Sequence, residues 1–432
     1  MTREETFLRF LRSAIWGKPE QLTGREMTLN QYQSLMKLAQ QQAVAALLAQ
    51  ALIDSGLRLP RQAAAEVYAL TEATRQRNKE MDEAVVALCR EMEERNIRIV
   101  VFKGQTLAPL YPDPGLRQSG DIDFACHPDD WDKAEQYFRE ELKLEIEDNV
   151  TKKHLSFERN GIEYELHRSM TEFCRPKNQH YWDRVVMPEI WETIDFIEIN
   201  GTRVPTLSAE INAIYVFVHI FHHLMSEGIG LRQFCDFALC AKESPLLTSP
   251  RGGKASLPNP LPHRKREKLE EEASLPNPTS VASSTTLTPD LRCPHRKREL
   301  LEKHLKGLGL LKAYTGLGAI LTDYLGLPEK EFPIPISQDD HRRAPKLLED
   351  IWKKGNFGKN EKYSQARGVI HGIEHLGRIF QQAWKFGHYA PAEAWWRVPY
   401  MFQWWGKKIL RVCTARGKRC AALARRRQET LA

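Results

Sequence analysis

The chain has 432 residues, 42% of them hydrophobic, which allows two or three domains with a sizeable buried core. It lacks an apolar run of about 18 residues, a basic-then-apolar leader and any C-x-x-C pair among its eight cysteines, which argues against a transmembrane helix, a secretory signal and a common zinc site. The cysteines lie far apart in sequence, so we expect the reduced thiols of a cytoplasmic protein. The formal net charge of +7 is concentrated at 407–427, where nine Lys or Arg occur without an acid, so the rest of the chain is near neutral.

Residues 1–96 are expected to form an N-terminal helical region. Apolar residues recur at helical spacing near the N-terminus and again between Leu35 and Leu47. After Pro60, residues 64–94 are rich in Ala, Glu, Arg and Met, which favour a helix. The pattern then changes to an apolar run at 97–102, which is typical of a buried strand.

Residues 97–206 are expected to form an α/β core. The predicted strands lie at 97–102, 121–125, 142–147, 154–158, 162–167, 194–199 and 202–204. A helix opened by Pro128 and Asp129 is predicted at 128–141. Asn160-Gly161 and Asn200-Gly201 each predict a hairpin, because both positions of such a turn tolerate φ above zero.

The first predicted strand ends in Lys103-Gly104, and the second carries Asp121 and Asp123. Alternate side chains of a strand point the same way, so both carboxylates leave one face of the sheet. Two carboxylates this close repel unless cations share them, which indicates a divalent metal site. A glycine between strand and helix lets a phosphate approach backbone N–H groups. Together the two features indicate a site that moves a nucleotidyl or phosphoryl group.

A third carboxylate is available in the second strand of the hairpin at 154–167. Glu163 and Glu165 share one face of this strand with His167. Glu163 lies beside the turn, whereas Glu165 lies two residues deeper in the sheet, so we favour Glu165. The alternatives are a solvated charge for Glu163 and a hydrogen-bonded structural role for His167.

The order of these elements resembles the DNA polymerase beta-like nucleotidyltransferase superfamily, in which a glycine element precedes a strand with paired acids. More closely, Phe102-Lys103-Gly104, the segment 110–117 (Leu-Tyr-Pro-Asp-Pro-Gly-Leu-Arg) and Gly120-Asp121-Ile122-Asp123 resemble the bacterial family called uncharacterised nucleotidyltransferases. The resemblance implies an α+β fold in which helical segments flank a mixed sheet. It also favours Glu165 as the third acid.

The resemblance further implies transfer of a nucleoside monophosphate from a nucleoside triphosphate such as ATP to a hydroxyl group, with release of pyrophosphate. The expected ligands of two Mg²⁺ ions are Asp121, Asp123 and Glu165. The expected phosphate-binding residues are Lys103, Gly104, Gln105, Thr106, Arg117 and Arg232.

Arg232 belongs to a second stretch that resembles the family, residues 230–239. Arg232 and Asp236 are four residues apart, one turn of a helix, so a structural ion pair between them is the alternative to phosphate binding. The preceding helix, 211–225, is apolar nearly all round and should be buried. We expect its His219 and His223 to be interior hydrogen-bonded histidines rather than metal ligands.

The remaining sequence predicts a C-terminal helical domain, at 207–245 and 299–406, that is interrupted by an insert. The insert, 246–298, is rich in Pro, Ser, Thr, Lys and Arg, and its composition favours disorder. Helices are predicted at 299–327 and 367–382, with a connector at 328–345 between them. The basic tail, 407–432, follows several tryptophans and suits an anionic partner such as RNA or acidic lipid, or a solvated role.

These motifs leave the acceptor open: a protein, a small molecule such as an antibiotic or sugar, or a tRNA end. Lys103-Gly104 and Arg117-x-Ser119-x-Asp121 also resemble toxin-type nucleotidyltransferases, which would act on tRNA. A third reading is a catalytically silent module that binds a nucleotide or a partner. The presence of all three acids argues against silence.

Overall fold

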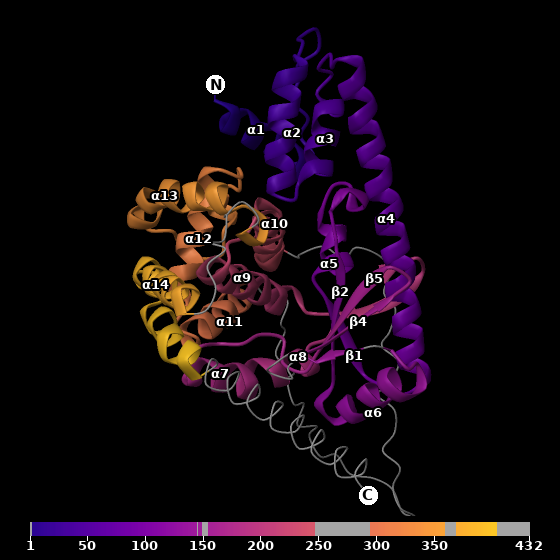
Figure 1. Ribbon diagram of the computed structural model, residues 1–432, viewed down its shortest axis with the longest axis vertical. Helices are drawn as coiled ribbons and strands as arrows, with labels where there is room; N and C mark the ends of the chain where they lie inside the picture. The colour runs from indigo at the N-terminus through magenta and orange to yellow at the C-terminus, as the bar shows by residue number, and fades with distance from the viewer. Residues whose placement is uncertain (1, 145, 149–153, 247–293, 359–368, 404–432) are drawn as a thin grey trace, which may run out of the picture.

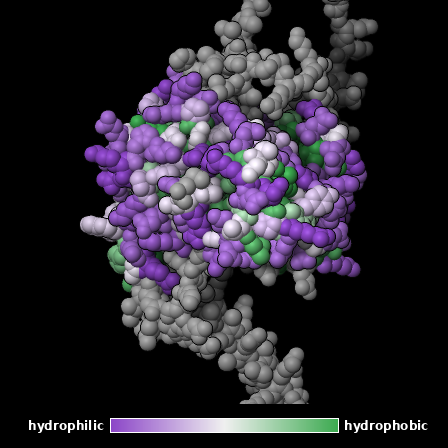
Figure 2. Space-filling view, turned by 90° about the horizontal axis from the view of Figure 1, so that it is seen from above, coloured by the Kyte–Doolittle hydropathy of each residue, from purple (hydrophilic) through white to green (hydrophobic). Residues whose placement is uncertain are grey.

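The computed structural model describes residues 2–144, 146–148, 154–246, 294–358 and 369–403 (Figure 1). The basic tail and most of the predicted insert, residues 247–293, lie outside these ranges. Among the described helices, none is both long and apolar enough to cross a membrane. Seen from the end that carries the N-terminal helices, the surface is mostly hydrophilic, with scattered apolar side chains (Figure 2).

The N-terminal region consists of helices α1 (Arg3–Trp16), α2 (Leu29–Gln41), α3 (Ala45–Asp54) and α4 (Arg61–Glu94). Thr2 and Thr28 open the first two helices with capping boxes, in which the hydroxyl accepts a bond from the N–H three residues on. The 34 residues of α4 span about 50 Å. Its first half packs against α1–α3, and its second half covers the sheet (Figure 1).

The core is a mixed seven-stranded sheet in the order β3-β4-β5-β2-β1-β7-β6. The strands are β1 (Ile99–Phe102), β2 (Asp121–Cys126), β3 (Glu147–Asp148), β4 (His154–Arg159), β5 (Ile162–His167), β6 (Asp195–Ile199) and β7 (Thr202–Thr206). β2 pairs antiparallel with β1 and parallel with β5. Helices flank this mixed sheet on both sides in sequence, which confirms the predicted α+β fold.

Both predicted hairpins form, and the two residues of each Asn-Gly turn have positive φ. The predicted strand at 142–147 is wrong over most of its length, because among the described residues from 142 to 148 only Glu147 and Asp148 form a strand, β3. The alternating apolar residues Leu142, Leu144 and Ile146 pack against the hydrophobic core between α4 and the sheet without pairing as a strand. A period-two pattern therefore marked burial here and not a sheet.

Short helices connect the strands. They are α5 (Gly104–Leu107), α6 (Trp131–Gln136), α7 (Pro176–Tyr181) and α8 (Met187–Glu192), with 3-10 turns at Ala108–Leu110, Pro114–Leu116 and Pro128–Asp130 and π-helical turns at Tyr137–Glu141 and Trp182–Val186. α6 and its flanking turns occupy the helix predicted at 128–141. The sequence analysis predicted neither α5 nor the continuous helical segment that α7, the π-helical turn and α8 form from Pro176 to Glu192.

The C-terminal helices are α9 (Ala209–Ser226), α10 (Leu231–Leu246), α11 (Pro294–Gly307), α12 (Leu311–Asp323), α13 (Gln338–Lys354) and α14 (Val369–Phe386), followed by a helix at 391–403, with 3-10 turns at Glu329–Glu331 and Asn356–Gly358. α9 is buried nearly all round, as predicted. The predicted connector at 328–345 is too long, because Ser337 caps α13 and starts it at Gln338. α11 likewise begins inside the predicted insert, at Pro294.

Two hydrophobic cores meet at the sheet. Ile122 and Phe124 of β2 face the core beneath α4 and α6. Phe102 of β1 faces the other core, which is built around α9 and the N-terminal helices. Asp121 and Asp123 alternate with Ile122 and Phe124, so the paired acids lie on the α9 side of the sheet.

Candidate active site

Four carboxylates share one face of two neighbouring strands. In the parallel pairing of β2 with β5, Asp121 is opposite Glu163 and Asp123 is opposite Glu165. Residues opposite each other in such a ladder point to the same side of the sheet. The structure thus brings the predicted acids together, and both Glu163 and Glu165 lie on the same face of the sheet as Asp121 and Asp123.

Three of these acids, Asp121, Asp123 and Glu163, border a cleft of about 470 Å³. Its other walls come from the turn between α2 and α3, from α9 and α10, and from the turn after α13. The lining residues are Ala43, Lys103, Gly104, Arg117, Gln118, Ser119, Gly120, Asp121, Asp123, Glu163, His219, Arg232, Asn356 and Phe357. The sequence motifs therefore supply one wall, and helices distant in sequence supply the others.

Asp123 is held as a carboxylate by two basic side chains. The Lys103 Nζ donates to Asp123 Oδ1 at 2.8 Å, and the His167 Nε2 lies 3.0 Å from the same oxygen. Burial opposes the charge, but Lys103 and His167 outweigh it and hold the pKa of Asp123 below its usual range. The same pairing raises the pKa of Lys103 against the effect of burial. Lys103, predicted to bind phosphate, is thus engaged with the paired acids.

Asp121 has the opposite electrostatic environment. Burial, and after it the charge of Asp123, raises the pKa of Asp121 to about 6. Lys103 and Arg232 lower this pKa without cancelling the effect of burial. The predicted repulsion within the pair is therefore concentrated on Asp121, so a cation bound here would relieve an unfavourable interaction.

Asp123, Glu165 and His167 form a compact group of potential metal ligands, with ligand atoms all within 4.8 Å of one another. The His167 Nε2 lies 3.2 Å from Glu165 Oε2, and this bond is the main cause that lowers the pKa of Glu165. The bonds of His167 to two acids agree with the hydrogen-bonded role expected for it. Glu163 instead lines the cleft, so each candidate for the third acid has one geometric feature in its favour.

The glycine turn offers fewer N–H groups than expected. Gly104 has φ +34°, and a Cβ added there would lie 3.4 Å from the Asp121 carbonyl. The Thr106 N–H donates to the Lys103 carbonyl at 2.8 Å, so it closes the turn itself. The Gln105 side chain is buried and donates to Asp82 of α4 at 2.6 Å. The amides of Gly104 and Gln105 thus remain the candidates for phosphate contact.

Arg117 takes part in a closed ion pair. Its Nε and Nη2 donate to the two oxygens of Asp236, each at 2.8 Å, and its Nη1 donates to Ser119. The Tyr111 hydroxyl donates to the same carboxylate at 2.7 Å. Arg117 is only 3% exposed, so it anchors the loop before β2 and is not a free phosphate ligand. The expected alternative pair of Arg232 with Asp236 is replaced by this one.

Arg232 lines the cleft, and no carboxylate in the described part of the chain pairs with it. Its Nη1 donates to the Gln118 carbonyl at 2.5 Å. Its Nε is buried and has no hydrogen-bond partner among the described residues. Burial, followed by the charge of Arg117, lowers the pKa of Arg232. An incompletely paired guanidinium beside Asp121 suits an anionic ligand.

The sequence analysis did not identify two residues of the cleft, His219 and Phe357, as site residues. His219 lines the cleft from α9, and burial lowers its pKa well below the usual value, so the imidazole is neutral. Its ring lies 4.4 Å from that of His223. Phe357 lines the cleft from the turn after α13. Neither carries a motif, since only packing brings them to the paired acids.

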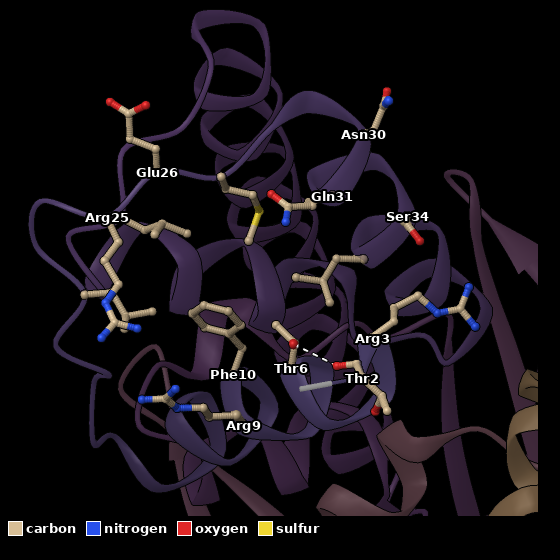
Figure 3. Close-up of a pocket in the computed structure, with 14 residues that line it drawn as sticks. Thr2, Arg3, Thr6, Arg9, Phe10, Arg25, Glu26, Asn30, Gln31 and Ser34 are labelled. Atoms are coloured by element: carbon tan, nitrogen blue, oxygen red, sulfur yellow. Dashed lines mark hydrogen bonds between the residues drawn. The ribbon is translucent and has the colours of Figure 1, made fainter.

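A second hollow, of about 580 Å³, lies between α1, α2 and the loop that joins them. Figure 3 shows Phe10 in its middle, with Arg9 and Arg25 on one side and Arg3 on the other. Arg9 pairs with Glu20. Although this hollow is larger, the described residues that line it include no paired acids, so the chemistry is assigned to the smaller cleft.

Part of the chain is similar to known proteins. Residues 29–249 match the model of a family described as "Uncharacterised nucleotidyltransferase". A solved structure, an antigenic nucleotidyltransferase-like protein from Paracoccidioides brasiliensis, matches with 17% sequence identity and a TM-score of 0.27, over 38% of this chain and 75% of that one. No curated protein matches.

Proposed function

Because the chain belongs to the uncharacterised nucleotidyltransferase family, we propose that it is a Mg²⁺-dependent enzyme that transfers a nucleoside monophosphate from a triphosphate to a hydroxyl acceptor. One observation carries the proposal: Asp121 and Asp123 share one sheet face with Glu163 and Glu165, and the two aspartates line a cleft that also contains Arg232. Acids and an incompletely paired guanidinium at one cleft suit a ligand that combines metal and phosphate.

The residues present fit a divalent metal. Asp123 and Glu165 supply carboxylate oxygens, which Mg²⁺ prefers, and the raised pKa of Asp121 marks negative charge that a cation would compensate. When bound, Mg²⁺ would supply electrostatic stabilisation of the charge on the phosphoryl oxygens. Lys103 Nζ stands beside Asp123 and neutralises it in this structure.

The protein's own groups then have separate tasks. Arg232 pairs with the phosphates, and the amides of Gly104 and Gln105 contact them from the glycine turn. The acceptor oxygen attacks the α-phosphorus, a new P–O bond forms, and the bond to pyrophosphate breaks. Glu165 orients the acceptor hydroxyl and takes its proton, while His167 holds Glu165 and Asp123 in place.

The test is transfer of an α-labelled nucleotide. The full chain is incubated with each labelled triphosphate, Mg²⁺ and a cell extract, beside the double variant Asp121→Asn/Asp123→Asn and the control Asp195→Asn on exposed β6. We expect labelled product from the wild type and the control only. Nuclease or protease treatment of the product then identifies the acceptor class, and nuclease-sensitive label would favour the tRNA-directed alternative.

Two results would reject the proposal in different ways. Binding of Mg²⁺-nucleotide without any labelled product would favour the silent binding module. Transfer and binding that both persist in the double variant would show that the paired acids are not the catalytic centre.

A further inference from the structure

The backbone at Phe357 is in an uncommon conformation for a bulky residue. Phe357 has φ +52° and ψ +41°, in the left-handed region. Glycines flank the turn at 355 and 358, with φ +67° and +66°. A side chain at such a φ opposes folding, and glycine would occupy the position without strain. The turn alone does not explain why a phenylalanine stands here.

The surroundings of the Phe357 ring explain the phenylalanine. One side is in edge contact with His223, with ring centroids 4.9 Å apart and planes at 68°. The half-buried side chain also lines the cleft that contains Asp121 and Arg232. Among the lining residues in the described part of the chain, Phe357 carries the only benzene ring. An aromatic ring thus shares one cleft with the groups assigned to phosphate and metal.

The turn that carries the Phe357 ring is held against the start of α10. The side-chain amides of Asn356 and Gln233 are hydrogen-bonded at 3.2 Å. A Cβ at Gly230 would lie 3.1 Å from the Asn356 Cβ, and one at Gly228 would lie 2.6 Å from the Lys354 Cβ. The two glycines therefore let the turn approach the start of α10 closely.

The buried Gln42 adds a second anchor. Its side chain accepts from the Leu231 N–H at 3.1 Å and donates to the Ile351 carbonyl at 3.4 Å. Its carbonyl accepts from the Arg232 N–H at 3.2 Å. One residue of the N-terminal region thereby fixes the end of α13, which leads to Phe357, relative to the start of α10, which carries Arg232.

From this geometry we propose that Phe357 is the stacking surface of a nucleobase subsite, on which the base lies while the phosphates reach Arg232 and the paired acids. The subsite rests on the proposed function and goes beyond it by assigning a place to the base. Every nucleobase has a π face, so stacking favours nucleotides over bare polyphosphate without choosing among bases. An ordered ring costs little entropy on binding, because its position is already set.

The experiment compares two ligands on four proteins. Calorimetry measures the binding of Mg²⁺ with a non-hydrolysable ATP analogue and of Mg²⁺ with inorganic tripolyphosphate to the wild type, Phe357→Gly, Phe357→Trp and the control Phe196→Gly. Glycine tolerates the positive φ, so it removes the ring without adding strain. Phe196 is 44% exposed on β6 and serves as a matched aromatic outside the cleft.

We expect Phe357→Gly to bind the ATP analogue about tenfold more weakly than the wild type and to bind tripolyphosphate with unchanged affinity. Phe357→Trp and Phe196→Gly should keep wild-type affinity for both ligands. Unchanged affinity of Phe357→Gly for the analogue, or equal loss of both ligands, would overturn the stacking role. If Phe357→Gly does not fold, the same two-ligand comparison on Phe357→Leu decides, because leucine keeps the apolar volume without a π face.

The two proposals fail in different ways. If the wild type bound neither ligand, the proposed function would fall and the subsite with it. If the wild type bound both ligands and only the stacking comparison failed, the nucleotidyl-transfer proposal would stand.

Discussion

Two buried aspartates near the cleft are paired with basic side chains in different ways. Arg117 forms a bidentate ion pair with the two carboxylate oxygens of Asp236, which also accepts a hydrogen bond from the Tyr111 hydroxyl. Asp123 receives Lys103 and His167 on a single oxygen, Oδ1, and Lys103 remains 19% exposed. The first arrangement is saturated and fixes a loop, whereas the second is open to the cleft, so its charges can be shared with a ligand.

Breaking the saturated pair should have the largest effect. Asp236→Asn removes the countercharge of the buried Arg117, and we expect the free energy of unfolding to fall by about 3–5 kcal/mol. Urea unfolding measures the loss. The control is Asp129→Asn, which breaks an exposed pair with Arg98 and should cost under about 1 kcal/mol. An Asp236→Asn protein as stable as the control would mean that the pair is not structural.

Loss of a charge from the paired acids, Asp121 and Asp123, should reduce activity, and for Asp121 it should do so with little loss of fold. Asp121→Asn and Asp123→Asn should each reduce nucleotidyl transfer at least about a hundredfold, which corresponds to roughly 3 kcal/mol. Without metal, Asp121→Asn should be as stable as the wild type or more so, because it removes the acid whose pKa is raised by burial and Asp123. Added Mg²⁺ and nucleotide should raise the melting temperature of the wild type and not that of Asp121→Asn. A marked destabilisation of metal-free Asp121→Asn would contradict this.

The choice of third acid can be tested by comparing Glu165 with Glu163 on strand β5. Glu165→Gln should reduce transfer about as much as the aspartate variants, because Glu165 belongs to the compact group with Asp123 and His167. Glu163→Gln, its matched control two residues away, should leave transfer within about threefold of the wild type. The reverse ranking in steady-state kinetics would assign the role to Glu163.

His222, a buried base for which the described residues supply no countercharge, gives an effect that appears only at acid pH. Burial, followed by the charges of His223 and Arg397, lowers the pKa of His222 to about 3, and its Nε2 is buried without a partner among the described residues. The unfolded histidine takes up a proton near pH 6.5, so the contribution of His222 is complete above that pH and is lost as the pH falls toward 3.

Between these pH values, His222 should add a slope of about 1.4 kcal/mol per pH unit to the unfolding free energy. Urea unfolding at several pH values should show a shallower slope for His222→Gln. The exposed His180→Gln should behave as the wild type. An unchanged slope in His222→Gln would show that His222 is protonated in the folded protein.

The sequence analysis predicted local structure correctly where a few neighbouring residues determine it. The two Asn-Gly turns formed because their backbone requires positive φ, which those residues tolerate. The alternation around Ile122 placed the paired acids on one face. The same reasoning failed at 142–147, because alternation reports burial and cannot report whether a partner strand is present.

The sequence by itself determined the hairpins, the buried α9 and the strand that carries Asp121 and Asp123, since each depends on local spacing and turn chemistry. Only the tertiary structure decided which arginine pairs with Asp236, because Arg117 is 119 residues away and Arg232 is nearer in sequence. It also decided that His219 and Phe357 line the cleft. Such contacts depend on how helices pack around the sheet, and side chains that meet only through packing leave no spacing for a sequence to reveal.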